Sequence, residues 1–233
     1  MAYNFDLIPN RRNPNVLNKW TIYPKDVLPM WVADMDFPAP RPILEELHKT
    51  VEHGVLGYEL LSKALQETVA ARMNHLYGWK VKPEAVVATT GVVNEFHEVK
   101  NNVGIPQIDA PLVKSVSDNV LHYEIDWGVF KKQVKKAGIF LLCNPHNPLG
   151  INFSRKDLLR MAEICIENNV LIVSDEIHSE LLLDDQKFTP LAKLSSEIAK
   201  HTITLIAPSK TFNVPGLFCG FASFPIKSFA KDI

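Results

Sequence analysis

The sequence has 233 residues, of which 46% are hydrophobic and 22% are charged, and its 25 basic residues nearly balance 26 acidic ones. This length and composition are typical of a globular protein with a sizeable core and argue against disorder, a coiled coil or a collagen-like repeat. The net charge of −1 provides no global field for nucleic acid or for an anionic membrane, so neither is an expected partner.

Targeting signals and metal-binding patterns are not recognised in the sequence. The longest apolar stretches, such as 139–143, are far shorter than the ~20 residues of a membrane span. The first residues lack the apolar core of a signal peptide, so we expect a protein of the cytoplasm. Three cysteines occur singly among apolar neighbours, without the C-x-x-C spacing of zinc sites. We therefore expect reduced, buried thiols and no metal site.

The first part of the chain predicts an arm followed by a domain. Residues 1–40 are rich in proline and show no helical period, which indicates an irregular N-terminal arm that lies over another part of the protein. Residues 41–233 are expected to form the main domain. Within it, Pro42 and Gly54 mark the beginning and the end of a first helix.

A second helix and a series of buried strands follow. Ser62 can cap this helix and Gly78 ends it. Ser154 opens a further helix with a pattern similar to a capping box. Short apolar runs predict four strands, at 85–90, 139–143, 170–174 and 202–207.

The order of these elements predicts the fold class. Strands that are apolar on both faces and joined through a helix are typical of a parallel sheet covered by helices. We therefore expect a three-layer α/β fold with a mostly parallel sheet. The interval 91–138 fits this expectation poorly, because it shows only a short helical pattern and weak apolar patches over an unusual length.

Polar residues follow each predicted strand, at the edge where open α/β sheets bind ligands. They supply a turn of backbone N–H groups, an amide, a carboxylate and an amine. Pyridoxal phosphate needs an amine for its Schiff base, a carboxylate at its pyridinium nitrogen, a donor to its ring hydroxyl and an anion site. The residues that suit these needs are Lys210, Asp175, Asn147 and the turn at Gly91.

Four segments carry a family resemblance. They are LPMWVADMDF at 28–37, NPHNPLG at 144–150, SDEIH at 174–178 and APSKTFN at 207–213. In this order and spacing they resemble the class I/II aminotransferase-fold enzymes, and more narrowly the MalY/PatB-type cystathionine β-lyases. The resemblance implies the large domain of fold type I, with pyridoxal 5′-phosphate as the cofactor.

The resemblance also implies roles for individual residues. Lys210 would be the Schiff-base lysine, Asp175 the partner of the pyridinium nitrogen and Asn147 the donor to the ring hydroxyl. Tyr58 would reach the phosphate of a neighbouring subunit, which implies a homodimer. The other implied cofactor contacts are His178, Gly91, Val92, Val93 and Ser209, and the implied substrate contacts are Ala33 and Asp34.

The resemblance is interrupted at one point and stops early. After the phosphate turn, relatives have a helix, a strand and an aromatic residue that stacks on the cofactor ring. Here Phe96–His97 run almost directly into later sequence, so we expect that strand and aromatic to be missing. The sequence also ends before the small domain that supplies an arginine for the substrate carboxylate. These groups orient cofactor and substrate, so their loss bears on the activity of this chain.

The arm segment 28–37 favours one reaction over its neighbours. It is similar to that of lyases that cleave cystathionine or cysteine S-conjugates to thiol, pyruvate and ammonia, with Lys210 as the base at Cα. An aminotransferase shares every other residue named above, and a non-catalytic remnant or interaction domain is a third reading. The SDEIH segment also matches a helicase box, but no P-loop precedes it.

Overall fold

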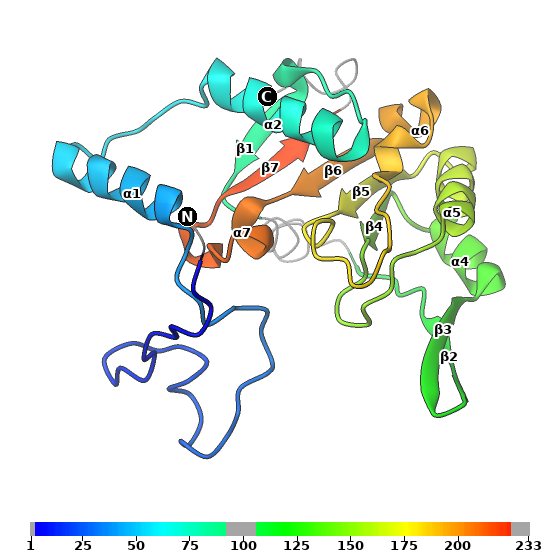
Figure 1. The fold of residues 1–233 in the computed structure, drawn as a ribbon. Coiled ribbons are helices and arrows are strands. Elements are labelled where there is room, and N and C mark those ends of the chain that lie inside the picture. Colours follow the sequence, from blue (N-terminus) through cyan, green and yellow to red (C-terminus); the bar gives the residue numbers. More distant parts are fainter. Residues whose placement is uncertain (1–2, 92–105, 225–233) are drawn as a thin grey trace. The chain divides into compact units, whose positions relative to one another are not determined.

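A computed structural model describes residues 3–91 and 106–224, which form two compact units (Figure 1). The first unit comprises the chain up to Leu60 together with Pro208–Cys219. The second comprises Leu61–Ala207 and the chain from Gly220 onward. These units follow contacts in space, and the sequence-based division into an arm of 1–40 and a domain of 41–233 stays a prediction.

The first unit contains one long helix, α1 (Arg41–His53), and two short ones, α7 (Pro208–Thr211) and the 3-10 helix η3 (Pro215–Leu217). Helix α1 begins after Pro40 and ends at Gly54, whose φ of 75° lies in the left-handed region, so the predicted helix is confirmed. None of its residues is buried. Its apolar stripe, Leu44, Leu47 and Val51, is 38–68% exposed.

The second unit is built on a five-stranded sheet in the order β1-β7-β6-β5-β4. Strands β4, β5 and β6 are parallel, whereas β7 is antiparallel to both of its neighbours. The carboxyl ends of β1, β4, β5 and β6 therefore lie at one edge of the sheet. The strands are β1 (Val86–Thr89), β4 (Ile139–Cys143), β5 (Leu171–Asp175), β6 (Thr202–Ile206) and β7 (Gly220–Ser223).

The α/β class and the mostly parallel sheet are thus confirmed, and the four predicted strands are present with ends shifted by a residue at most. The antiparallel strand β7 was not predicted. The described helices around this sheet are α2 (Lys63–Tyr77), α4 (Trp127–Val134), α5 (Arg155–Glu167) and α6 (Ser196–Lys200), with 3-10 turns η1 (Pro83–Ala85) and η2 (Leu191–Lys193). No helix in the described ranges is long and apolar enough to cross a membrane.

Side-chain caps define where these helices begin. The hydroxyl of Ser62 accepts the N–H of Leu65, and the hydroxyl of Ser154 accepts the N–H of Asp157, as the sequence indicates. Asp126 caps α4 in the same way, although the sequence analysis did not recognise that helix. The caps satisfy N–H groups that have no partner inside the helix.

The main core lies between α4, α5 and one face of the sheet. Leu158 and Cys165 of α5 pack against Leu142 of β4 and Ile172 of β5, and all four side chains are buried. On the opposite face Leu205 and Ala222 are buried, but Leu141 and Val87 are almost half exposed. The structure therefore has a dense core on one face and apolar surface near both edges of the other.

A two-stranded hairpin, β2 (Leu112–Ser117) and β3 (Val120–Ile125), extends beside α4 (Figure 1). Asp118 and Asn119 form its turn, with φ angles of 51° and 59°. Positive φ at both central residues matches the right-handed twist of paired strands. The sequence analysis assigned only weak apolar patches to this interval. It missed the hairpin because the valines of the hairpin are exposed and give no burial pattern.

Candidate active site

Asp175 lies at the carboxyl edge of the sheet, as the last residue of β5. One carboxylate oxygen accepts the N–H of Ile177 at 3.1 Å. Its backbone carbonyl accepts the N–H of Asn144 at 2.9 Å, which ties the ends of β4 and β5 together. His178 lies half-buried in the turn that follows. The structure therefore places a carboxylate and an imidazole at the edge where the sequence predicts a ligand site.

The loop after β4 holds its backbone in place and leaves an amide exposed. Asn144 is 1% exposed, and its side-chain oxygen accepts the N–H of Phe153 at 3.0 Å. The thiol of Cys143 accepts the N–H of Asn147 and donates to the carbonyl of Pro145, both at 3.4 Å. Burial raises the pKa of this thiol to about 11, so it stays protonated and can donate. Within the described chain, the exposed side chain of Asn147 has no hydrogen bond.

Glu176 is a buried carboxyl group that the sequence analysis did not recognise. It is 1% exposed, and one of its oxygens accepts the hydroxyl of Ser174 at 3.0 Å and the N–H of Leu191 at 2.9 Å. Burial raises its pKa to about 8, and these hydrogen bonds oppose the shift. The signal for it in the sequence is a second acidic residue directly after a buried strand. It joins the strand end that carries Asp175 to η2.

Gly91 follows the end of β1, where the sequence predicts a phosphate-binding turn. Gly91 has a φ of 108°, which favours glycine, and Gly220 of β7 lies against it. A Cβ at position 220 would lie 2.7 Å from Thr89 Oγ1 and 3.3 Å from Gly91 Cα. The Thr89 hydroxyl is buried and has no hydrogen-bond partner within the described residues. Val92 and Val93, the rest of the predicted phosphate turn, lie outside these residues.

The first unit carries Lys210, which lies in α7. Its Nζ donates to the carbonyl of Ala33 at 3.2 Å. Ser209 beside it is buried, and the carboxylate of Asp34 is paired with Arg11 at 2.7 Å. Lys210 is therefore brought together with Ala33, and the family resemblance implies a site role for both residues. Tyr58 belongs to the same unit and is fully exposed.

A cluster of charges orders the arm, and the sequence analysis did not predict it. Asp36 accepts hydrogen bonds from Arg11 at 2.8 Å and from Trp20 Nε1 at 2.7 Å, and Lys19 lies 3.0 Å from its second oxygen. Burial would raise the pKa of Asp36, but the donors of Trp20, Lys19 and Arg11 outweigh it and lower the pKa. Asp36 therefore stays ionised, and the arm has a polar cluster where it lacks an apolar core.

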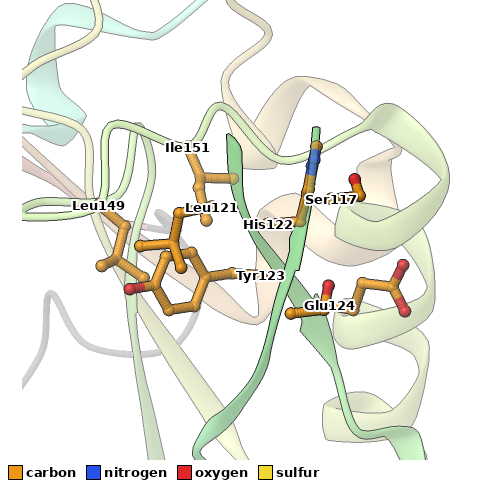
Figure 2. A pocket seen from close by; sticks show the side chains of 8 residues that line it. Ser117, Leu121, His122, Tyr123, Glu124, Leu149 and Ile151 are labelled. Atoms are coloured by element: carbon orange, nitrogen blue, oxygen red, sulfur yellow. The ribbon is translucent and has the colours of Figure 1, made fainter. Parts of the chain in front are cut away.

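The predicted residues thus fall into two groups. Those of the first unit are Lys210, Ser209, Ala33, Asp34 and Tyr58, and those of the second are Gly91, Asn147, Asp175 and His178. A cavity of about 480 Å³ also lies in the second unit, alongside the hairpin (Figure 2). Leu121 and Tyr123 line it on the side of Leu149, and none of the predicted site residues does.

Comparison with known proteins assigns the family. A family model described as aminotransferase class I and II matches residues 104–227. The chain belongs to the class I and II aminotransferase family. Among family members it is similar to cystathionine β-lyase PatB of Bacillus subtilis, with 41% identity over 82% of this chain and 55% of PatB. The resemblance stated from the sequence is therefore confirmed.

Solved structures of the family share the fold. The PLP-bound putative aminotransferase of Clostridium difficile 630 matches with a TM-score of 0.86 and 32% identity, over 96% of this chain and 64% of that one. Cystalysin of Treponema denticola, which contains pyridoxal 5′-phosphate, matches with a TM-score of 0.85 and 27% identity, over 96% and 64%. The chain spans a little more than half of the length of PatB and just under two thirds of these structures.

Proposed function

We propose that the protein is a pyridoxal 5′-phosphate-dependent C–S β-lyase, which cleaves cystathionine or cysteine S-conjugates to thiol, pyruvate and ammonia. The observation that supports this most is the 41% identity to cystathionine β-lyase PatB. The second observation is local. Asp175 lies at the edge of the sheet where open α/β folds bind ligands, as this chemistry requires.

The residues present fit the cofactor. The exposed amide of Asn147 can donate to a ring hydroxyl, and the carboxylate of Asp175 can hold a proton on a ring nitrogen. Gly91 and the hydroxyl of Thr89, which has no hydrogen-bond partner in the part of the chain that the structure describes, would offer an anion site at the end of β1. His178, Val92, Val93 and Ser209 complete the proposed cofactor contacts.

When bound, the cofactor supplies an electron sink for negative charge at the substrate Cα. Lys210 would anchor it covalently, and the free Nζ of Lys210 would take the proton from Cα as a general base. The carbonyl of Ala33 accepts a hydrogen bond from this amine and orients it. Ala33 and Asp34 would lie beside the substrate, because the arm segment that contains them contacts Lys210.

We also propose a homodimer in the cytoplasm. Tyr58 is fully exposed and helix α1 has no buried residue, so both are open to a second subunit, where Tyr58 would reach the cofactor phosphate. All three cysteines are free thiols, which suits a reducing compartment. The small-molecule partner would be an amino acid, and the charge balance gives no reason to add nucleic acid or a membrane.

An aminotransferase is the second candidate, because the similar PLP-bound structure from Clostridium difficile is described as a putative aminotransferase. Mixing the protein with the cofactor tests both candidates. We expect an absorption band of covalently bound cofactor, which Lys210→Ala abolishes and which Lys131→Ala, a change at an exposed lysine of α4, preserves. Pyruvate formed from cystathionine supports the lyase, whereas amino-group exchange with keto acids supports the aminotransferase. Absence of the band supports the third reading, a non-catalytic remnant or interaction domain.

A further inference from the structure

The segment that carries Lys210 is grouped with the arm. Strands β6 and β7 on either side of Pro208–Cys219 belong to the second unit, whereas the segment itself belongs to the first. Its described side-chain hydrogen bonds to the arm come from Lys210 and Asn213, which are three residues apart. The position of the lysine therefore depends on how the arm is held.

The side chain of Asn213 forms hydrogen bonds with the backbone of the arm. Its side-chain oxygen accepts the N–H of Met35 at 3.1 Å, and its side-chain nitrogen donates to the carbonyl of Met35 at 3.2 Å. The same nitrogen donates to the carbonyl of Phe37 at 2.8 Å. The amide thus pairs with both backbone groups of Met35, as a neighbouring strand would. Asn213 has a φ of 54°, a region that asparagine tolerates better than most residues.

Ion pairs hold the arm segment 33–37 on its other side. The carboxylates of Asp34 and Asp36 pair with Arg11 at 2.7 and 2.8 Å, and Lys19 lies 3.0 Å from Asp36. The carboxylates of this segment therefore contact basic side chains, and Arg11 also donates to the carbonyl of Met35 at 3.3 Å. The backbone groups at 33, 35 and 37 contact Lys210 and Asn213. The segment is thus held from two sides, and Met35 is contacted from both.

We propose that Asn213 is a positioning residue for Lys210. Its three hydrogen bonds to Met35 and Phe37, called the clasp below, hold the carbonyl of Ala33 within hydrogen-bond distance of the lysine amine. The proposal rests on the proposed function for the role of Lys210 in the reaction. The clasp itself is a property of the first unit, and it can be tested without cofactor. Loss of the clasp leaves the amine of Lys210 less well oriented and more exposed to reagents.

Two substitutions at Asn213 separate the clasp from the backbone conformation. Asn213→Asp keeps the acceptor for Met35 and the tolerance of positive φ, but it removes both donors and sets a carboxylate against two carbonyls. Asn213→Gly keeps the backbone angle and removes the side chain. The matched control is Asn169→Asp, because Asn169 also has a positive φ, of 55°, and lies at the end of α5. Circular dichroism verifies that each variant is folded.

The first measurements use the protein without cofactor. We expect the Met35 amide proton to exchange faster in Asn213→Gly, and Lys210 to be reductively methylated about two- to tenfold faster in both variants, as loss of one or two hydrogen bonds implies. Exposed Lys131 serves as the internal reference for the labelling. Unchanged Met35 exchange or unchanged Lys210 labelling would overturn the proposal, as would equal effects in Asn169→Asp.

The second measurement uses the protein loaded with cofactor. We expect the kcat for elimination from cystathionine to fall about tenfold in both Asn213 variants, with a much smaller change in KM. Unchanged kcat alongside altered labelling overturns the positioning role. If the wild-type chain binds no cofactor, the proposed function fails, but the exchange and labelling results still decide whether the clasp exists.

Discussion

Asp175 and Glu176 are adjacent in the chain, yet their carboxyl groups have different surroundings. Asp175 is half-buried at the edge of the sheet, whereas Glu176 is enclosed and bonded to Ser174 and Leu191. Burial disfavours the charged form of Glu176 and raises its pKa to about 8. The pair therefore combines the Asp175 side chain, which lies at the edge of the sheet, with a Glu176 carboxyl that is largely protonated at neutral pH and supports the strand end.

Glu176→Gln is expected to flatten the dependence of stability on pH. The folded-state pKa of Glu176 is raised, so its stabilisation is fully present below its usual pKa of 4.5 and is lost as the pH rises through about 8. The loss for the wild type is about 5 kcal/mol at most. Glutamine keeps the oxygen acceptor and cannot ionise. Urea unfolding at pH 5, 7 and 9 measures how the free energy of unfolding changes with pH in the wild type and in the variant.

Glu197→Gln is the control for this series, because Glu197 is exposed and pairs with Lys200 on α6. It should keep the wild-type fall in stability between pH 5 and pH 9. A Glu176→Gln protein whose unfolding free energy falls as steeply as that of the wild type would show that another group causes the slope.

Candidate site residues could be named from the sequence where the signal is local, and their roles stay predictions. Asp175 and Lys210 stand out because polar groups directly follow apolar strands. The roles of Glu176 and Asn213 depend on partners 15 and 178 residues away, Leu191 and Met35. No spacing within a motif reports such contacts, so the sequence does not show what either side chain binds. Both are found only when the chain is folded.

At the scale of elements, the end of β1 meets the start of β7 through small residues. Thr89 pairs with Gly220 in the ladder, and a Cβ at position 220 would approach Thr89 Oγ1 to 2.7 Å and Gly91 Cα to 3.3 Å. Contacts this short force neighbouring atoms to shift. The glycine at 220 therefore lets the two strands pair beside the turn that we propose as an anion site.

Gly220→Ala is expected to destabilise the protein by about 1–3 kcal/mol, because the added methyl overlaps the Thr89 hydroxyl. Adding Thr89→Ala removes the closest atom and should recover most of the loss. Thr89→Ala alone should cost little, since that hydroxyl has no partner among the described residues. Thermal and urea unfolding of the three variants measure the coupling free energy between positions 89 and 220.

Gly138→Ala is the neutral reference for these variants, since a Cβ there would meet no atom within 4 Å. If the double variant is no more stable than Gly220→Ala, the backbone of Gly91 is the obstacle and the hydroxyl is not.

The sequence predicts elements well where caps and glycine stops frame them, as Ser62 and Gly78 do for α2. It fails for β7, which has only four residues and is antiparallel in a sheet expected to be mostly parallel. It also fails for the hairpin, whose Asp118–Asn119 turn lacks the usual glycine. In both cases pairing with another strand, and not local periodicity, creates the element.

At the scale of the whole molecule, the first unit exposes many large apolar side chains, and contiguous apolar patches commonly mark interaction surfaces. In α1, Leu47 and Val51 are exposed, and the following residues Leu56, Tyr58 and Leu60 are exposed as well. A second copy of the chain is a partner that such a surface could bind. The proposed homodimer explains why an amphipathic helix has no buried residue.

The pair Leu47→Gln and Val51→Gln tests this explanation. Each side chain buried on association contributes roughly 1.5 kcal/mol or more. A homodimer loses both side chains from each of its two subunits, about 6 kcal/mol in all, so its dissociation constant should rise about 10⁴-fold. Helical content should stay constant, since no residue of α1 is buried in its own unit. Sedimentation equilibrium over a range of concentrations measures the constant, and circular dichroism measures the helix.

The control pair is Lys49→Gln and His53→Gln, which lie on the opposite side of the same helix and should leave association unchanged. A wild-type chain that stays monomeric at every concentration would remove the homodimer from the proposal. If both pairs weaken dimerisation equally, α1 contributes to the interface but its apolar stripe is not packed there. If the Leu47 and Val51 substitutions alone weaken dimerisation, the apolar stripe is packed in the interface, because apolar side chains stabilise a dimer only when association removes them from water.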